Sequence, residues 1–192
     1  MKVYISGQIT GLSYNEARIR FEKGKYILEQ LGYTVINPFN NGLKYNDSWE
    51  NHMKKDIEML YGCDAIFMLD NWISSVGANI EYNISKEKGF KVFFENDFKF
   101  EKMNIKDAIS VLTQMEFKYI CDKTRERKKF YARMIYTNYM YNRRPRAKIE
   151  DIARELNKNK LIPYYYLKKY KEEMKYNKEF RELCSMVDYL LK

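Results

Sequence analysis

The stretch Ala65-Ile66-Phe67-Met68-Leu69 is apolar at every position. Such a run is typical of an interior strand of a parallel sheet, because helices cover both faces of that sheet and keep its side chains from water. Three other short segments have the composition of strands, at residues 2–6, 33–37 and 91–95. We therefore predict four strands, with residues 65–69 in the interior of the sheet.

A helix is predicted in each interval between these strands. Ser13 and Glu16 form a capping box, which marks the start of a helix. Apolar residues and one glycine then recur at helical spacing, at Ala17, Phe21, Gly24, Leu28 and Leu31. Two further helices are predicted, one ending at Gly62 and one over residues 78–88. Alternating strands and helices give βαβ units, so we predict an α/β fold with a small doubly wound parallel sheet of four to five strands, flavodoxin-like or Rossmann-like.

The charge of the chain is concentrated in its second half. Residues 1–103 contain 13 Lys and Arg against 14 Asp and Glu, a net charge of −1. Residues 104–192 contain 22 against 12, a net charge of +10, together with 11 of the 18 tyrosines. We therefore predict two domains, an α/β domain over residues 1–103 and a basic, all-helical unit over residues 104–192. A composition bias without functional meaning is the alternative explanation for the excess of lysine.

The three cysteines lie far apart, and His52 is the only histidine. This pattern argues against a disulfide framework, a zinc site and a Ser-His-Asp triad, so no metal or cofactor is expected and a cytoplasmic location is favoured. No apolar run approaches the roughly 18 residues that a membrane span needs, and no secretory signal is recognisable, so no membrane contact is expected. Catalysis would then depend on carboxylates, hydroxyls and backbone amides.

The predicted topology locates a ligand site before any residue is given a role. Open α/β sheets bind ligands at the carboxyl ends of their strands. The loop after the first strand offers Gly7, Gln8 and Thr10, and the loop after the third offers Ser75 and Gly77 at a helix start. Glycines let backbone amides approach a ligand closely, and a helix N-terminus suits a sugar hydroxyl or a phosphate. The alternative is that the glycines are present only because the turns of these loops need them.

Two carboxylates and a tyrosine are candidates to react with such a ligand. Asp56 lies on or beside the predicted apolar stripe of its helix, where a charge needs a partner or a role. Glu81 lies one turn into the helix that follows Ser75, where it could also simply favour the helix dipole. Tyr4, in the first strand, can reach the same strand ends. Two carboxylates and a phenol suit glycosidic chemistry, with one carboxylate as nucleophile and the other handling protons.

Four elements of the sequence, taken together, resemble a known enzyme family. They are Tyr4-Ile5-Ser6-Gly7-Gln8-Ile9-Thr10-Gly11, then Asp56, then Cys63-Asp64-Ala65-Ile66, and finally the segment from Trp72 to Glu81. Their order and spacing resemble the nucleoside 2-deoxyribosyltransferase family and its relatives that hydrolyse the N-glycosidic bond of deoxynucleoside monophosphates. The resemblance covers about residues 1–95 and is closest to an uncharacterised branch of that family.

The resemblance implies a role for each matching residue. Glu81 would be the nucleophile that attacks the anomeric carbon, and Asp56 would be the general acid and base near the departing base. Tyr4 would hold or polarise Glu81. Ser75 and Gly77 would bind the 5′ end of the sugar or its phosphate. The resemblance also implies a homo-oligomer.

The expected function is therefore cleavage or exchange of the N-glycosidic bond of a nucleoside or nucleotide, by hydrolysis or by transfer to a second base. Thr10 stands where the monophosphate hydrolases have an arginine, which leaves the need for a 5′-phosphate open. The alternative is a non-catalytic nucleotide-binding module coupled to a nucleic-acid-binding helical domain. A third hypothesis is a packing or assembly protein.

The second half of the chain is predicted to be helical. Residues 116–142 are predicted as one long helix, and residues 149–156 and 164–175 as the helices of a helix-turn-helix, joined by a segment longer than the usual turn. Basic side chains that could contact a nucleic acid are Arg143, Arg144, Arg146, Lys168 and Lys169. The alternative is a solvated helical unit that packs on the sheet or on a neighbouring molecule and uses its tyrosines for packing.

Overall fold

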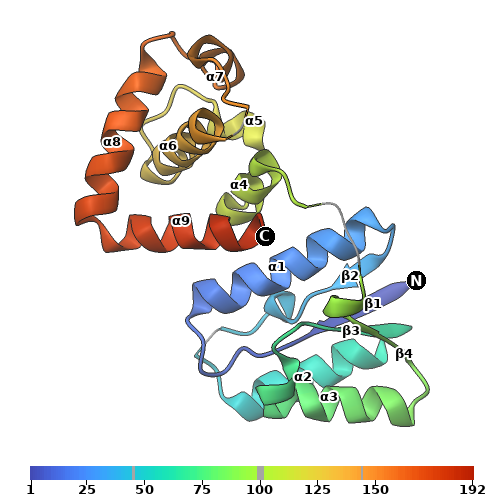
Figure 1. Cartoon of the computed structure of the whole chain (residues 1–192). Coiled ribbons are helices and arrows are strands. Elements are labelled where there is room, and N and C mark those ends of the chain that lie inside the picture. Colours follow the sequence, from blue (N-terminus) through green and yellow to red (C-terminus); the bar gives the residue numbers. More distant parts are fainter. Residues whose placement is uncertain (45, 99–101, 144) are drawn as a thin grey trace. The chain divides into compact units, whose positions relative to one another are not determined.

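A computed structural model of the chain describes residues 1–44, 46–98, 102–143 and 145–192 (Figure 1). The chain forms two compact units, Met1–Glu101 and Lys102–Lys192. The sequence places this boundary two residues later, after residue 103. The two units are described separately below.

The first unit contains a four-stranded, all-parallel sheet in the order β2-β1-β3-β4. Its strands are β1 (Lys2–Ser6), β2 (Thr34–Ile36), β3 (Ala65–Met68) and β4 (Lys91–Phe94). Val3 of β1 is paired with Val35 on one side and with Ala65 on the other. The predicted α/β class is confirmed, and the apolar segment that begins at Ala65 is an interior strand buried at every position.

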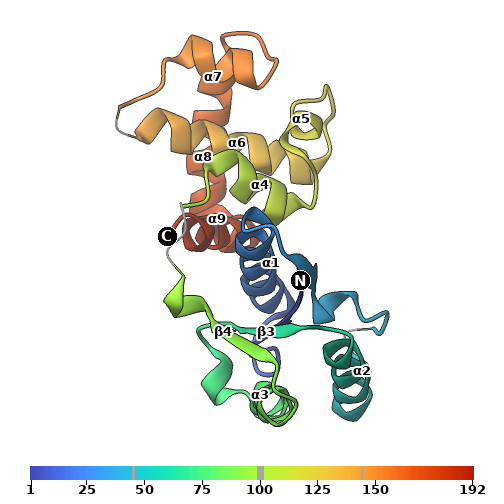
Figure 2. The same cartoon turned by 90° about the vertical axis from the view of Figure 1, so that its right-hand side faces the viewer.

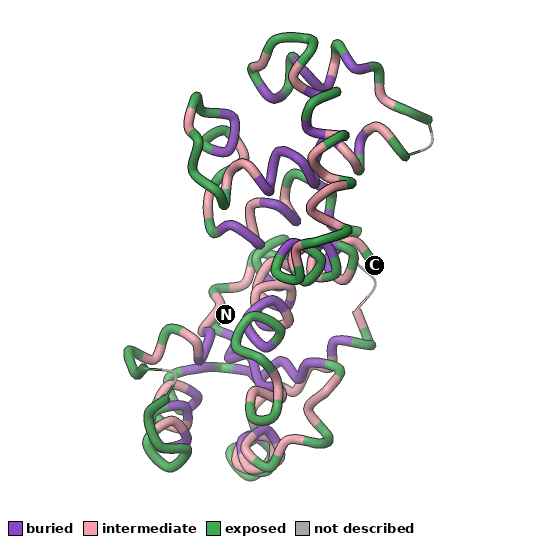
Figure 3. Tube along the Cα trace, turned by 90° about the vertical axis from the view of Figure 1, so that its left-hand side faces the viewer, coloured by how far each residue is buried: buried purple, intermediate pink, exposed green. Residues whose placement is uncertain are grey.

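Three helices cover the two faces of this sheet. Helix α1 (Tyr14–Gln30) lies on one face, and α2 (Trp49–Tyr61) and α3 (Val76–Glu87) lie on the other (Figure 2). Alternate strand residues face opposite sides, as the strand period of two requires. One buried cluster comprises Val3, Ile5, Phe21, Leu28, Ala65, Phe67 and Leu69. The second comprises Tyr4, Leu60, Cys63, Ile66, Met68 and Ala78. Figure 3 colours the buried positions of the chain purple.

Serine side chains cap the starts of α1, α2 and α3. The predicted N-cap at Ser13 is confirmed, because its Oγ accepts a hydrogen bond from the Glu16 backbone N–H at 3.2 Å. Ser48 caps α2 and Ser75 caps α3 in the same way. Because each helix follows a parallel strand, these N-termini lie at the carboxyl edge of the sheet. That edge therefore collects free backbone N–H groups as well as loop side chains.

Gly24 lets α1 approach the sheet closely. A Cβ atom at this position would lie 2.8 Å from Leu69 Cδ2 and 3.3 Å from Phe67 Cε1. The sequence pattern includes Gly24 in the apolar face of the helix, and the structure shows that its lack of a side chain is what the packing requires.

The described part of the second unit is helical. Its helices are α4 (Ile105–Thr113), α5 (Phe117–Ile120), α6 (Arg127–Asn142), α7 (Ile149–Glu155), α8 (Ile162–Tyr176) and α9 (Lys178–Leu190). The predicted all-α character is confirmed. Among the helices in the described ranges, none is both long and apolar enough to cross a membrane.

The prediction of one long helix over residues 116–142 is wrong, because the chain leaves the helix after Ile120 and resumes it at Arg127. The guanidinium of Arg133, only 2% exposed, donates hydrogen bonds to the carbonyl oxygens of Ile120 at 2.8 Å and Thr124 at 2.8 Å. Lys158 Nζ donates to the Cys121 carbonyl at 2.6 Å. These cations satisfy carbonyl groups that a continuous helix would have paired internally.

Aromatic side chains hold the helices of the second unit together. Phe130 of α6 contacts the rings of both Tyr165 and Tyr166 of α8, with centroids 6.2 and 5.7 Å apart. Phe180 of α9 contacts Tyr131 of α6 in an edge-to-face arrangement at 4.9 Å. These tyrosine rings therefore contact aromatic side chains of their own unit.

Candidate active site

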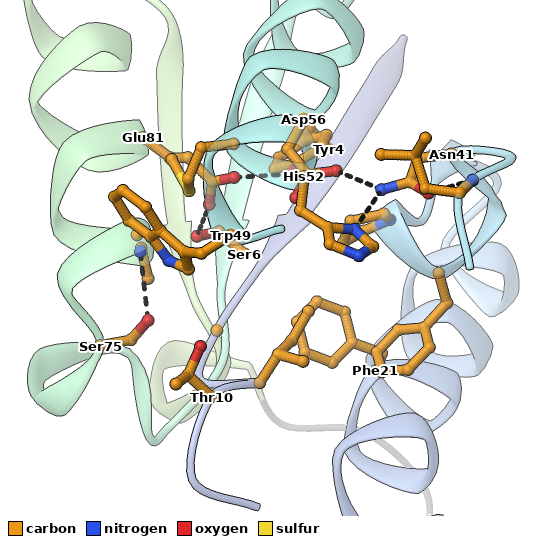
Figure 4. Close-up of a pocket in the computed structure, with 18 of the residues that line it drawn as sticks. Tyr4, Ser6, Thr10, Phe21, Asn41, Trp49, His52, Asp56, Ser75 and Glu81 are labelled. Carbon is orange, nitrogen blue, oxygen red and sulfur yellow. Dashed lines mark hydrogen bonds between the residues drawn. The ribbon is translucent and has the colours of Figure 1, made fainter. Parts of the chain in front are cut away.

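A pocket of about 460 Å³ opens at the carboxyl edge of the sheet (Figure 4). Residues from the end of β1, the loop after it, the loop after β2, helix α2 and the start of α3 line it. Strands β2 and β3 lie on opposite sides of β1, so the chain leaves β1 and β3 toward opposite faces of the sheet. This is the switch point at which open α/β sheets bind ligands, and it is where the sequence predicts the site.

Two hydroxyl groups from β1 hold the carboxylate of Glu81 at the base of this pocket. Tyr4 Oη donates a hydrogen bond to Glu81 Oε1 at 2.7 Å, and Ser6 Oγ donates one to Oε2 at 2.5 Å. Tyr4 and Ser6 are two residues apart in a strand, so both side chains point to the α3 face of the sheet. Glu81 is 5% exposed. Both of its oxygens are therefore fixed in one orientation within the pocket.

Burial and these hydrogen bonds act on the pKa of Glu81 in opposite directions. Burial raises the pKa to about 7, while the hydrogen bonds from Ser6 and Tyr4 favour the ionised form and limit the rise. Burial, followed by the nearby charge of Glu81, keeps the pKa of Tyr4 well above its usual value. The phenol therefore stays protonated and acts as a hydrogen-bond donor, while Glu81 can lose its proton near neutral pH.

Asp56 brings a second buried carboxyl group to the same pocket. It lies on α2 and accepts a hydrogen bond at Oδ1 from Asn41 Nδ2 at 3.0 Å. Burial raises the pKa of Asp56 to about 6, against the lowering effects of the Asn41 hydrogen bond and of nearby His52. Both carboxyl groups thus titrate near neutral pH, which is the range that general acid–base catalysis uses.

Gly7, Thr10, Ser75 and Gly77 all line the pocket. A Cβ atom at Gly7 would lie 2.8 Å from Leu69 Cδ1, and one at Gly77 would lie 2.9 Å from Met53 Sδ. Both glycines therefore allow close packing of the pocket wall. Ser75 Oγ accepts a hydrogen bond from the Ala78 N–H at 3.2 Å and so caps α3.

Gln8, the remaining residue predicted to bind a ligand, connects two loops and does not itself line the pocket. Its Nε2 donates to the Thr10 carbonyl at 3.1 Å, and its Oε1 accepts from Ser74 Oγ at 3.1 Å. Its backbone N–H donates to Asn71 Oδ1 at 3.2 Å. Gln8 thus joins the loop after β1 to the loop after β3.

Several pocket residues lie outside the set that the sequence predicts. The polar ones are Ser6, Asn41, Asp47 and His52, and aromatic side chains come from Tyr14, Phe21, Phe39 and Trp49. Ser6 could have been found from its strand spacing to Tyr4. The described residues of the lining include no lysine or arginine, and among all described residues no three His, Cys, Asp or Glu side chains are grouped to hold a metal ion.

The residues predicted to contact nucleic acid lie in the second unit. Arg143, Arg146 and Lys168 are exposed. Arg146 lies over the Tyr141 ring, 4.4 Å from its centroid, and Lys169 forms an ion pair with Glu172 at 2.6 Å. The fifth predicted residue, Arg144, lies outside the described residues.

Residues 1–94 match the model of a family that is described as a domain of unknown function, DUF4406. The matched segment ends with the last strand of the sheet and includes every residue of the pocket lining described above. Comparisons with curated proteins and with solved structures found no match.

Proposed function

We propose that the first unit cleaves or exchanges the N-glycosidic bond of a nucleoside, with Glu81 as the nucleophile. The observation that carries the proposal is the fixed carboxylate of Glu81, held by Tyr4 and Ser6 in a pocket that also contains the buried carboxyl group of Asp56. The resemblance to the nucleoside 2-deoxyribosyltransferase family supports the same assignment, because it matches Tyr4, Asp56 and Glu81.

In the first step, an oxygen of ionised Glu81 forms a bond to the anomeric carbon of the sugar. The bond from that carbon to the base nitrogen breaks, and its electron pair stays on the base, which takes a proton from the Asp56 carboxyl group. In the second step, the Asp56 carboxylate removes a proton from water or from a second base. That acceptor attacks the anomeric carbon and releases Glu81 as a carboxylate.

The pKa values predict a narrow optimum between about pH 6 and 7. The reactive form has Glu81, with a pKa of about 7, ionised and Asp56, with a pKa of about 6, protonated. Activity should therefore fall below about pH 6, where both groups become protonated, and above about pH 7, where both become ionised. Between these values the pair holds about one proton, and the reactive form carries it on Asp56. A profile of kcat/KM against pH checks this, and a flat profile across neutral pH would contradict it.

The charge of the pocket favours a substrate without a phosphate group. The lining contains Asp47, Asp56 and Glu81, and its described residues include no lysine or arginine. A phosphate monoester carries a charge of about −1.5 to −2 near neutral pH, so a 5′-monophosphate would meet like charges without a counter-ion. The substrate proposed is therefore an uncharged nucleoside, with the sugar at the Ser75 and Gly77 end.

Incubation with a set of nucleosides and their 5′-monophosphates, scored by chromatography for free base, tests the proposed function. At least one nucleoside should release its base, and faster than its 5′-monophosphate does. Binding of nucleosides without release of base from any compound would instead support a non-catalytic binding module.

We also propose that the second unit binds nucleic acid through electrostatic contacts. The supporting observation is its excess of positive charge, which includes exposed side chains at Arg143, Arg146 and Lys168. Lys169 and Tyr165 contribute less to this proposal, because Lys169 is paired with Glu172 and the ring of Tyr165 contacts Phe130.

Binding of the full chain to duplex DNA should weaken steeply with salt. Each neutralised phosphate releases condensed counter-ion, so about five contacts predict a slope of about −4 to −5 in log affinity against log salt concentration. Lys168→Glu should weaken binding more than the same charge change at exposed Lys192, since Lys168 lies on α8, the second helix of the predicted helix-turn-helix. A gel-shift series in increasing salt measures both effects. Absence of a shift at low salt would leave the second unit as a packing or assembly element.

A further inference from the structure

The loop between β2 and α2 brings an amide side chain, Asn41, against the carboxyl group of Asp56. Asn41 Nδ2 lies 3.0 Å from Asp56 Oδ1 and 3.2 Å from His52 Nδ1. Its own oxygen, Oδ1, accepts a hydrogen bond from the Leu43 backbone N–H at 3.0 Å. These three contacts use both ends of the amide, and Figure 4 shows its nitrogen joined by dashed lines to both Asp56 and His52.

The chemistry of the three partners allows only one orientation of the Asn41 amide. A reversed amide would turn its oxygen toward the Asp56 carboxylate and its NH₂ group toward the Leu43 N–H, so that two acceptors and two donors would face each other. In the observed orientation every contact pairs a donor with an acceptor. Asn41 therefore always presents a donor to Asp56 Oδ1.

The orientation of the Asn41 amide determines which nitrogen of His52 carries the hydrogen. Its Nε2 lies 3.0 Å from the Lys44 carbonyl oxygen, which can only accept, so Nε2 carries a hydrogen. Its Nδ1 faces the Asn41 NH₂ group, which can only donate, so Nδ1 is unprotonated. The lone pair of Nδ1 accepts the hydrogen bond from the amide and so anchors it.

The turn that carries Asn41 is itself well ordered by hydrogen bonds. Pro38 begins a short 3-10 helix, η1 (Pro38–Asn40), whose Pro38 carbonyl accepts from the Asn41 N–H at 3.1 Å. Gly42 follows with a φ of +83°, a backbone conformation that glycine adopts at low cost. The amide is therefore presented by a turn with a defined shape.

We infer that Asn41, locked by His52, is a positioning residue that keeps Oδ1 of Asp56 as a hydrogen-bond acceptor and so directs the transferable proton to Oδ2. Among the described residues, no hydrogen bond to Oδ2 accompanies the one at Oδ1. A proton on Oδ1 would face the Asn41 N–H, donor against donor, whereas a proton on Oδ2 leaves that hydrogen bond intact. This inference rests on the proposed function in one respect, the use of Asp56 as the general acid.

Other groups around Asp56 set its charge state together with Asn41. Glu81 on α3 and Tyr4 on β1 interact electrostatically with it, and His52 lies one helical turn before it on α2. Asn41 differs from these groups because it combines a direct hydrogen bond with a fixed donor. Removing that donor should raise the pKa of Asp56, and replacing it with a carboxylate should raise the pKa further.

Asn41→Asp is the sharpest test, since the new side chain has the same shape and can still accept from the Leu43 N–H. Carbon-13 NMR of the Asp56 carboxyl group, assigned by its absence in Asp56→Asn, should show a pKa at least about one unit higher than in the unchanged protein. Asn40→Asp places the same charge on the exposed neighbouring residue and should leave the pKa nearly unchanged. Asn41→Ala should raise it by a smaller amount and serves if the aspartate variant does not fold.

Two further readouts separate this inference from the proposed function. Nitrogen-15 NMR of the single histidine should show Nε2 protonated and Nδ1 unprotonated. If base release is observed, the alkaline limb of its pH profile should move upward in Asn41→Asp with the pKa of Asp56. An unchanged Asp56 pKa in both Asn41 variants, or a hydrogen on Nδ1 of His52, would overturn the inference. The NMR results hold even if no substrate is turned over, an outcome that would refute the proposed function alone.

Discussion

Replacement of Glu81 by glutamine should abolish base release, with a fall in kcat of about three orders of magnitude or more, because the variant lacks the attacking carboxylate. Glutamine keeps the shape of the side chain and can exchange hydrogen bonds with Tyr4 and Ser6, whose hydroxyl hydrogens can rotate. Single-turnover measurement of free base with a nucleoside that the unchanged protein accepts gives the rate directly.

Thermal unfolding provides the control for this variant. Burial raises the pKa of Glu81 in the folded state, so its contribution to stability is fully present below the unfolded pKa and is lost as the pH rises through about 7. Glutamine does not ionise, so Glu81→Gln should not lose stability as the pH rises through about 7. At alkaline pH its Tm should therefore equal or exceed that of the unchanged protein. Base release at the unchanged rate from the folded variant would refute the role of Glu81.

Replacement of Asp56 by asparagine should slow base release by about two to four orders of magnitude while leaving nucleoside binding nearly intact. The amide is close in shape to the acid, but it cannot give a proton to the departing base or take one from the acceptor. Substrates whose bases leave readily without protonation should lose less activity than those whose bases need the proton.

Calorimetry with a slowly reacting nucleoside separates binding from chemistry in this variant. Comparable Kd values for Asp56→Asn and the unchanged protein are expected, together with loss of the alkaline limb of the pH profile. Weakened binding with an unchanged rate of the bound complex would mean that Asp56 only positions the ligand.

Most of the α/β unit follows from local sequence signals. The apolar run beginning at Ala65 predicts an interior strand, and Ser13 with Glu16 predicts the start of α1, because both signals depend on nearby residues alone. A related argument predicts that Tyr4, Asp56 and Glu81 lie close together. Parallel topology brings strand ends and helix starts to one edge, and the structure places all three in one pocket there.

The second unit was harder to predict because tertiary contacts override its local pattern. Nothing near residues 121–126 signals a break, since the cations that take their carbonyl groups come from Arg133 and Lys158, further along the chain. The sequence prediction does not include helix α9, although Asn177 caps it and Phe180, Cys184 and Val187 are buried at helical spacing. That pattern was a usable local signal.

Asn41 illustrates the part of the site that a single sequence does not reveal. It lies in a polar loop, 15 residues before Asp56, with no periodicity to relate the two. Only the folded path of the chain between β2 and α2 brings the amide to the carboxyl group. Its neighbour Asn40 has the same residue type and a similar local sequence, yet its side chain is exposed.

Mass spectrometry of a trapped intermediate tests the central claim most directly. A nucleoside with fluorine at the 2 position of the sugar slows the attack on the anomeric carbon and the later release of the sugar, because the electronegative group destabilises the positively charged transition states of both steps. We predict that the quenched protein carries one fluorinated sugar, located on the peptide that contains Glu81, and that Glu81→Gln carries none. Base release with the sugar attached to a different residue, or with Glu81 unmodified throughout turnover, would contradict the proposed mechanism.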